Sequence, residues 1–247
     1  LQIMGNAAAV TDRSFAVPDG VNNGQYGIGI VIDFLALAGK YSGYPVDFTY
    51  PTMTAVVPAN IALIAGAKNA DEAKKFMAYT MSVPGQQLLF DPKIGRLPIL
   101  PYSMLKPPAG YPVPQDIAKR AKVQFNTELS GQRYPVVISL FDQMVTFRLK
   151  ELQAATKAIH EAAAALKAKP NARGGELLAQ ARSLAYTSLV GADNVKNPEF
   201  LELFRKSRRD VAVSKQLTGM EQMWSEKARA NYERARQLAD EARGLAK

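Results

Sequence analysis

Few side chains in this sequence belong to the types that carry out chemistry. The chain has no cysteine and one histidine, His160, which excludes disulfides, thiol catalysis and cysteine-ligated zinc. His160 falls on the surface of a predicted helix and has no metal-ligating neighbour at a suitable spacing. No pair of a nucleophile and a base stands out elsewhere. We therefore expect no catalytic residues, no metal and no cofactor, and we expect that the protein is not an enzyme.

The glycines Gly27 and Gly29 resemble the start of a dinucleotide-binding turn. Ile32 stands where that fingerprint needs its third glycine, and no phosphate-binding Gly-x4-Gly-Lys-Ser/Thr motif is present. Nucleotide binding is not expected.

Asp33 is the one charged side chain within an apolar run, residues 28–38. A buried carboxylate needs a partner or hydrogen bonds. Asp33 either caps the helix that follows or faces a polar cleft, and the sequence favours neither interpretation. The nearby aromatic residues either line a ligand cleft or pack in a core. They are Phe34, Tyr41, Tyr44, Phe48 and Tyr50.

The elements that would position these groups differ between the two halves of the chain. Residues 1–105 read as alternating strands and helices, which predicts an α/β fold. Strands are predicted at 26–37 (turning helical near Asp33), 46–50, 55–57 and 61–64, and helices at 69–81 and 82–90, with Ser82 as the N-cap of the last.

The second half reads as helices behind a proline-rich linker, residues 106–115. Prolines there remove backbone donors and favour extended geometry. Beyond it, apolar residues recur every three or four positions, which is typical of amphipathic helices. The helices are predicted at 137–168, 176–190, 198–207 and 217–245.

The charge of the chain is +9, from 31 basic and 22 acidic residues. Residues 1–115 contribute +1 and residues 116–247 contribute +8. Because both signs alternate along the predicted helices, we interpret the excess as solvated helix faces and expect no nucleic-acid partner. A DNA-binding role would require salt-sensitive retention on DNA.

The chain starts at Leu1, without a basic region followed by an apolar one. We therefore expect a processed chain, with its signal peptide removed or absent, or a fragment.

Several motifs, in order and at their spacing over about residues 10–105, resemble the closing part of bacterial extracellular solute-binding proteins. These are the type II periplasmic binding proteins of ABC importers. The branch with the greatest similarity is the ferric-iron and phosphoglycerate-transport-regulatory one, and residues 134–137 and 140–144 resemble a helical extension of the latter. The motifs are at 17–21, 24–29, 31–34, 50–51, 57–61, 66–69, 72–76, 82–86 and 96–98.

This resemblance implies a C-terminal portion of a two-lobe protein. It assigns 1–48 to the end of the second lobe, 49–105 to the crossover and the end of the first, and 116–247 to the helical extension. The N-terminal half of the same protein would be missing and would complete the sheets. Phe34 and Leu35 stand where iron-binding relatives carry two tyrosines, so ferric binding is not expected.

The resemblance further implies capture of a small, possibly anionic, solute between two lobes, outside the inner membrane, and delivery to an ABC permease. Candidate ligand-binding residues lie near the predicted cleft, with Arg96 as an anion clamp. They are Ser14, Asp33, Tyr50, Thr52, Thr54 and Arg96.

Two alternatives remain open besides import. In the first alternative, the chain is a ligand-sensing accessory that signals to a membrane histidine kinase. In the second, it is a helical interaction module that binds a partner through the apolar stripe from Leu217 to Leu245.

Overall fold

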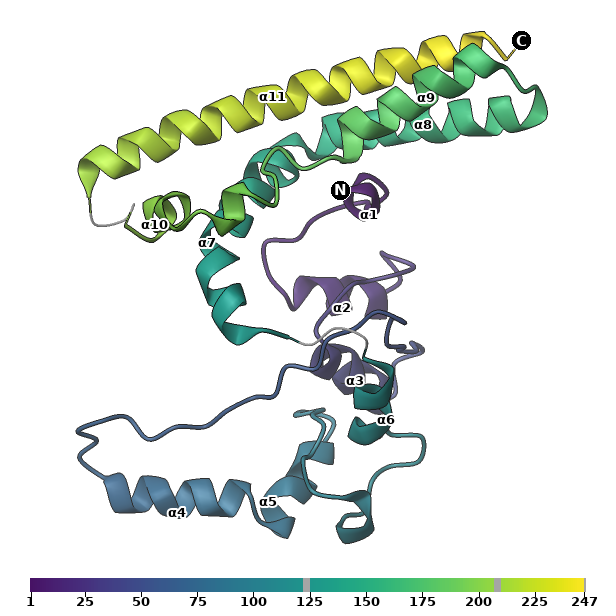
Figure 1. The fold of residues 1–247 in the computed structure, drawn as a ribbon. Coiled ribbons are helices and arrows are strands. Elements are labelled where there is room, and N and C mark those ends of the chain that lie inside the picture. The colour runs from purple at the N-terminus through teal and green to yellow at the C-terminus, as the bar shows by residue number, and fades with distance from the viewer. Residues whose placement is uncertain (122–124, 207–209, 247) are drawn as a thin grey trace. The chain divides into compact units, whose positions relative to one another are not determined.

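The computed structural model describes residues 1–121, 125–206 and 210–246, which form two compact units. Unit 1 comprises residues 1–10 and 127–247, and unit 2 comprises residues 11–126. Every regular element of the described residues is a helix (Figure 1). The predicted α/β fold, a portion of a two-lobe type II periplasmic binding protein, is therefore wrong, because the described residues contain none of the strands that it needs.

The failed strand predictions have a common physical reason. Residues 27–32 are irregular, and Ile28, Ile30 and Ile32 leave 89%, 73% and 58% of their surface exposed. β-branched residues that alternate favour an extended backbone, but a strand is stabilised only by the ladder and side chains of a neighbour. The described residues pair no segment with this one.

Unit 1 is built from helices of very different length (Figure 1). α1 adds to this unit by packing on α8, and α11 packs along α8 and α9. The elements are α1 (Gln2–Gly5), α7 (Thr127–Met144), η3 (Thr146–Arg148), α8 (Leu149–Ala168), α9 (Ala172–Tyr186), η4 (Asn194–Lys196), α10 (Pro198–Lys206) and α11 (Val211–Gly244).

The core of unit 1 is closed by its own helices. Leu152, Ala162 and Ala235 are 0% exposed, on α8 and α11. Alanines at the contact faces let the helix axes approach closely, while Leu177 and Tyr232 fill the remaining space. A second cluster, which contains Phe204 and Leu217, joins α7 and α10 to the start of α11.

The single helix predicted for 137–168 is two helices. The backbone leaves helical geometry at Val145 (φ −120°, ψ −64°), and η3 joins α7 to α8. The Tyr232 hydroxyl donates to the carbonyl oxygen of Met144 at 2.8 Å, and the Arg148 Nε donates to the Ser225 hydroxyl at 3.0 Å. Side chains of α11 thus satisfy groups at the break, a tertiary effect that helical periodicity does not reveal.

Unit 2 has shorter helices and a smaller core. The core consists of Leu37, Phe90, Leu105 and Tyr111. Because Leu105 directly precedes the proline-rich segment and Tyr111 lies in it, that segment packs within unit 2, and the two units divide at 126/127. The elements are α2 (Ala16–Asn22), α3 (Asp33–Tyr41), α4 (Ala70–Thr80), α5 (Val83–Gln87), η1 (Leu88–Phe90), η2 (Tyr102–Met104) and α6 (Pro114–Arg120).

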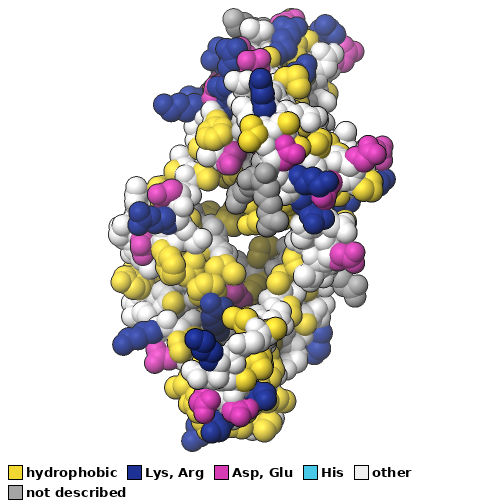
Figure 2. Space-filling view, turned by 90° about the vertical axis from the view of Figure 1, so that its left-hand side faces the viewer, with side chains coloured by type: hydrophobic (Ala, Val, Ile, Leu, Met, Phe, Trp, Pro, Cys, Tyr) yellow, Lys and Arg dark blue, Asp and Glu magenta, His cyan; other side chains and the backbone are white. Residues whose placement is uncertain are grey.

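Local signals for two helices of unit 2 are confirmed. α4 matches the predicted 69–81, and Ser82 caps α5 by accepting the Gly85 N–H at 3.3 Å. α4 buries none of its residues, and Phe76 is 60% exposed. Figure 2 shows apolar side chains lying open among charged ones on one face of the molecule.

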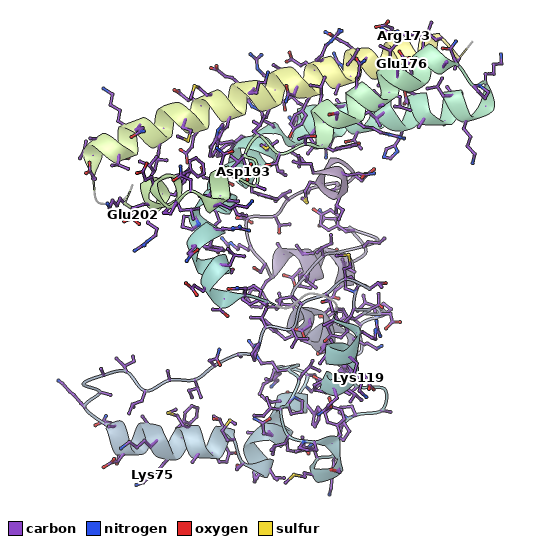
Figure 3. The ribbon with its side chains drawn as sticks, viewed as in Figure 1. Lys75, Lys119, Arg173, Glu176, Asp193 and Glu202 are labelled. Atoms are coloured by element: carbon purple, nitrogen blue, oxygen red, sulfur yellow. The ribbon has the colours of Figure 1, made fainter. Side chains whose placement is uncertain are left out.

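The charged surface consists largely of local pairs. Arg173 and Glu176 form a 2.8 Å ion pair at the start of α9, where Figure 3 shows them one turn apart. Lys119 pairs with Asp116 on α6 in the same way. Such exposed pairs contribute at most about 1 kcal/mol each, and they agree with the interpretation of the charges as solvated helix faces.

Candidate functional site

Asp33 lies at the first position of a helix, behind the N-cap residue Ile32, and holds the side chain of Tyr50. It is the first residue of α3, and its Oδ1 accepts the backbone N–H of Phe34 at 2.8 Å. Its Oδ2 accepts the hydroxyl of Tyr50 at 3.0 Å. The carboxylate therefore stabilises the start of a helix and holds a second predicted site residue.

Tyr50 lies on the irregular segment after α3 and is fixed from several directions. Its ring meets that of Phe48 edge-on, with centroids 4.7 Å apart, and its carbonyl oxygen accepts an N–H of Arg120 at 3.4 Å. Burial, reinforced by the Asp33 carboxylate, raises the pKa of the Tyr50 phenol well above its usual value. Tyr50 thus stays protonated and donates to Asp33 at neutral pH.

Arg96 joins this cluster through a ring. Its guanidinium carbon lies 3.9 Å from the centroid of Phe34, the residue next to Asp33. Gly95 makes this approach possible: its φ is +60°, and a Cβ there would lie 2.9 Å from backbone atoms of α3. The Arg96 side chain is exposed, so it remains accessible to an anion while it stacks on Phe34.

An aromatic cluster centred on Tyr111 lies next to the backbone of Arg96. Tyr111 packs against Tyr41 (centroids 4.8 Å apart) and Phe90 (4.9 Å) and donates its hydroxyl to the carbonyl oxygen of Arg96 at 3.2 Å. Burial raises the pKa of Tyr111 to about 12. Within the described residues the buried Tyr41 hydroxyl has no hydrogen-bond partner. Of the five aromatic residues that the sequence singled out, Tyr41 and Phe48 pack against the core of unit 2, whereas Tyr44 is 50% exposed.

The other three predicted residues lie on other segments. Ser14 lines a hollow with Ile32 and Leu35, which flank Asp33 and Phe34, but Asp33 itself does not line it. Thr52 is exposed and Thr54 is half-buried on an irregular stretch. The candidate site is therefore Asp33, Tyr50 and Arg96, together with partners that the sequence did not identify.

The sequence did not identify three partners of this site. They are Phe34, on whose ring the Arg96 guanidinium stacks, Tyr111 and Arg120. Tyr111 lies in the proline-rich segment, which the sequence assigned to a linker. Arg120 lies after that segment, in residues that the sequence assigned to the helical extension. The signal available was an aromatic residue within that segment. An aromatic side chain among prolines contributes a large apolar surface that favours burial.

The contacts of this site are hydrogen bonds and a cation–π contact within unit 2. The three groups contact one another or Phe34, and they hold the start of α3 against residues 48–50 and 95–96. Among the residues that the structure describes, no group of three or more His, Cys, Asp or Glu is placed to hold a metal ion. His160, in unit 1, lies 3.1 Å from the Asn6 side-chain oxygen through its Nε2.

The apolar stripe from Leu217 to Leu245 is not an open surface. Leu217, Ala228, Ala235 and Leu238 are buried, against α7–α10. The prediction that this stripe binds a partner is wrong, because the helices of unit 1 use it as their own core. Within the described residues no helix has the length and apolar character to cross a membrane.

Comparison with known proteins adds one relationship. No family model and no solved structure matches the chain. Over 167 residues the chain is 34% identical to the phosphoglycerate transport regulatory protein PgtC of Salmonella typhimurium and, to the same extent, to that of Salmonella typhi. The match covers 68% of this chain and 41% of each relative. The chain is thus similar to part of a protein that is named for regulating transport.

Proposed function

We propose that this protein is a regulatory accessory of a membrane transport system, and that it acts by contact with a sensor or transport component. The similarity to phosphoglycerate transport regulatory proteins supports regulation, and the correction of the fold removes the basis for solute capture between two lobes. The proposal includes that the protein is not an enzyme.

The observation that supports action by contact with another protein is the exposure of large apolar side chains in unit 2. Ile28, Ile30 and Ile64 are 89%, 73% and 80% exposed. Large apolar side chains that are this exposed suit a surface that a partner covers. Unit 2 therefore supplies the contact with a membrane component, and unit 1 is a self-contained helical domain.

The proposed place of action is outside the inner membrane. A sensor that responds to an external solute receives its signal on that side, and a histidine kinase ectodomain is the candidate partner. Protease treatment of spheroplasts checks this placement: an extracytoplasmic chain is degraded while a cytoplasmic marker survives.

Within this function, Arg96 is the candidate for sensing a small anionic solute. Its guanidinium is exposed, oriented by Phe34 and 3.9 Å from that ring's centroid. Phosphoglycerate is the probe suggested by the relatives' name. Bidentate contact with a phosphate or carboxylate is a typical use of arginine.

A transport assay separates regulation from solute capture. The gene is deleted, and uptake of radiolabelled phosphoglycerate is measured with the permease under its own promoter and under a constitutive promoter. A regulator is needed only in the first case, so constitutive permease expression restores uptake. If uptake stays lost although the permease is present in the membrane, the protein takes part in transport itself and the proposal is wrong.

A further inference from the structure

A hollow opens between α8 and α11 of unit 1, two helices that pack along each other (Figure 1). Its volume is about 280 Å³, which is room for about nine water molecules and lies near the lower end of small-molecule pockets. Both helices contribute charged side chains to it. The lining consists of Lys150, Glu151 and Ala154 of α8 and Tyr232, Glu233 and Arg236 of α11.

The two uncharged lining residues give the hollow a fixed shape. Ala154 ends at a methyl group, so α8 presents no long side chain at this position to fill the space. Tyr232 is 1% exposed, and its hydroxyl donates to the carbonyl oxygen of Met144 at 2.8 Å, which holds the ring in place. A preformed hollow costs less entropy when a ligand enters it.

Toward the C-terminal ends of α8 and α11, charged side chains pair with one another. Glu161 of α8 pairs with Lys157 at 3.9 Å and with Arg243 of α11. Arg243 also pairs with Asp240 at 3.0 Å. The pairs join the two helices there, so each charge in this group has a partner of opposite sign.

The basic residues of the hollow differ from this group. Within the described residues, neither Lys150 nor Arg236 forms an ion pair. The two glutamates of the lining pair instead with Arg148 (3.3 Å) and Arg229 (3.7 Å), which lie outside the lining. Since the acids are neutralised from outside, the hollow keeps two positive charges without a partner, one from each helix.

A lysine and an arginine on opposite walls suit an oxyanion. The guanidinium donates two parallel hydrogen bonds to one such group, and the ammonium supplies a compact charge. We propose that the hollow between α8 and α11 binds a small ligand through a phosphate group held by Lys150 and Arg236. Because two carboxylates share the lining, the ligand carries one anionic group and neighbouring hydroxyl groups that donate to them. This inference does not rest on the proposed function.

The first test titrates the full chain with glycerol 3-phosphate by calorimetry at constant ionic strength. Lys150→Gln/Arg236→Gln should weaken binding at least about tenfold, since charge-assisted hydrogen bonds are lost. Lys167→Gln/Arg182→Gln is the matched control, because it removes the same charge from exposed positions of unit 1 outside the hollow. The control variant should bind like the unchanged protein. Circular dichroism verifies that both variants keep their helices.

The second test changes the shape of the hollow and leaves its charges in place. Ala154→Leu fills the space between Lys150 and Arg236 and should weaken binding of glycerol 3-phosphate at least about tenfold. Ala164→Leu makes the same change at an exposed position of α8 and should have no effect. Arg96→Ala, in unit 2, should also leave this binding unchanged, so the result for the hollow is separate from the role proposed for Arg96.

A third measurement distinguishes a free phosphate ester from a lipid headgroup of the same chemistry. The chain is sedimented with vesicles of phosphatidylglycerol and, for comparison, of phosphatidylcholine. If the first vesicles retain it and Lys150→Gln/Arg236→Gln alone abolishes retention, the hollow binds a lipid headgroup. If neither vesicle retains the chain while glycerol 3-phosphate binds, the ligand is a free phosphate ester.

Three results would overturn the proposal. One is the absence of binding to both glycerol 3-phosphate at millimolar concentration and the phosphatidylglycerol vesicles. Another is equal weakening by the two double variants, which would mean that the general positive charge of unit 1 attracts the anion. The third is unchanged affinity of Ala154→Leu, which would place the anion outside the hollow.

Discussion

Unit 1 and unit 2 are similar in length but use their apolar residues in opposite ways. Unit 1 buries Leu152, Leu177 and Leu238 to 3% exposure or less, whereas unit 2 leaves Ile28, Ile30 and Ile64 largely in water. A 3.6-residue repeat finds its partners on nearby helices, while an alternating pattern needs a neighbouring strand. The difference shows that apolar residues stabilise a unit only where the neighbouring helices or strands that their spacing requires are present.

The largest expected effect tests the closed core of unit 1. Leu152→Ala removes a fully buried side chain and should lower the free energy of unfolding by about 3 kcal/mol. Ile30→Ala in unit 2 should change it by less than about 0.5 kcal/mol, because the side chain is exposed. Chemical denaturation followed by circular dichroism measures both. Equal losses would contradict the contrast between the units.

The next effect tests the break between α7 and α8. Tyr232→Phe removes the hydroxyl that the Met144 carbonyl accepts, so a buried oxygen loses its partner. The expected loss is about 1–2 kcal/mol. Tyr134→Phe, on an exposed side chain of the same unit, is the matched control. If the two variants unfold alike, the break does not depend on this hydrogen bond.

The stability of the fold should depend on pH through Tyr50. The pKa of Tyr50 is raised above its usual value of 10.0, first by burial. The folded state therefore keeps a proton that the unfolded state releases, so the stabilisation is complete below about pH 10 and is lost as the pH rises further. Tyr50→Phe should make the alkaline loss of stability less steep, as measured by unfolding at several pH values. A slope identical to that of the unchanged protein would mean that Tyr50 titrates as if exposed.

The smallest expected effect concerns the stability contribution of Arg96. Arg96→Ala removes the contact with Phe34 and should cost about 0.5–1 kcal/mol, the range of exposed cation–π pairs. Arg96→Lys keeps the charge and loses the planar stacking. Calorimetric titration with phosphoglycerate separates the two roles. If Arg96→Ala leaves phosphoglycerate affinity unchanged, Arg96 is not an anion clamp.

The sequence predicts best what neighbouring residues decide. The helix at 69–81 and the Ser82 cap depend on a few residues in a row, and both are confirmed. The strand at 26–37 was wrong because a strand depends on distant partners. The break at Val145 was missed for the same reason, since its stabilising groups Tyr232 and Ser225 come from α11.

The candidate site follows the same division. Asp33 was identified by its charge within an apolar run, but its contact with Tyr50 spans 17 residues and arises from tertiary packing. The aromatic partner of Arg96 was visible only as a residue type. Ser14, Thr52 and Thr54 were chosen by resemblance to a fold that the chain does not adopt. Ser14 lines a hollow whose lining does not include Asp33, and Thr52 and Thr54 lie on an irregular stretch.

The dependence of the α7–α8 break on α11 has a consequence for biosynthesis. Ribosomes make chains from the N-terminus, so α7, α8 and α9 are synthesised before Ser225 and Tyr232 exist. During that interval nothing on α11 accepts or donates at the break, and the alanine-lined faces of α8 and α9 lack the helix that covers them. The direction of α7 is therefore fixed only late in translation, and we expect ribosome-bound chains that end before Ser225 to be degraded more readily by protease than chains that extend past Tyr232.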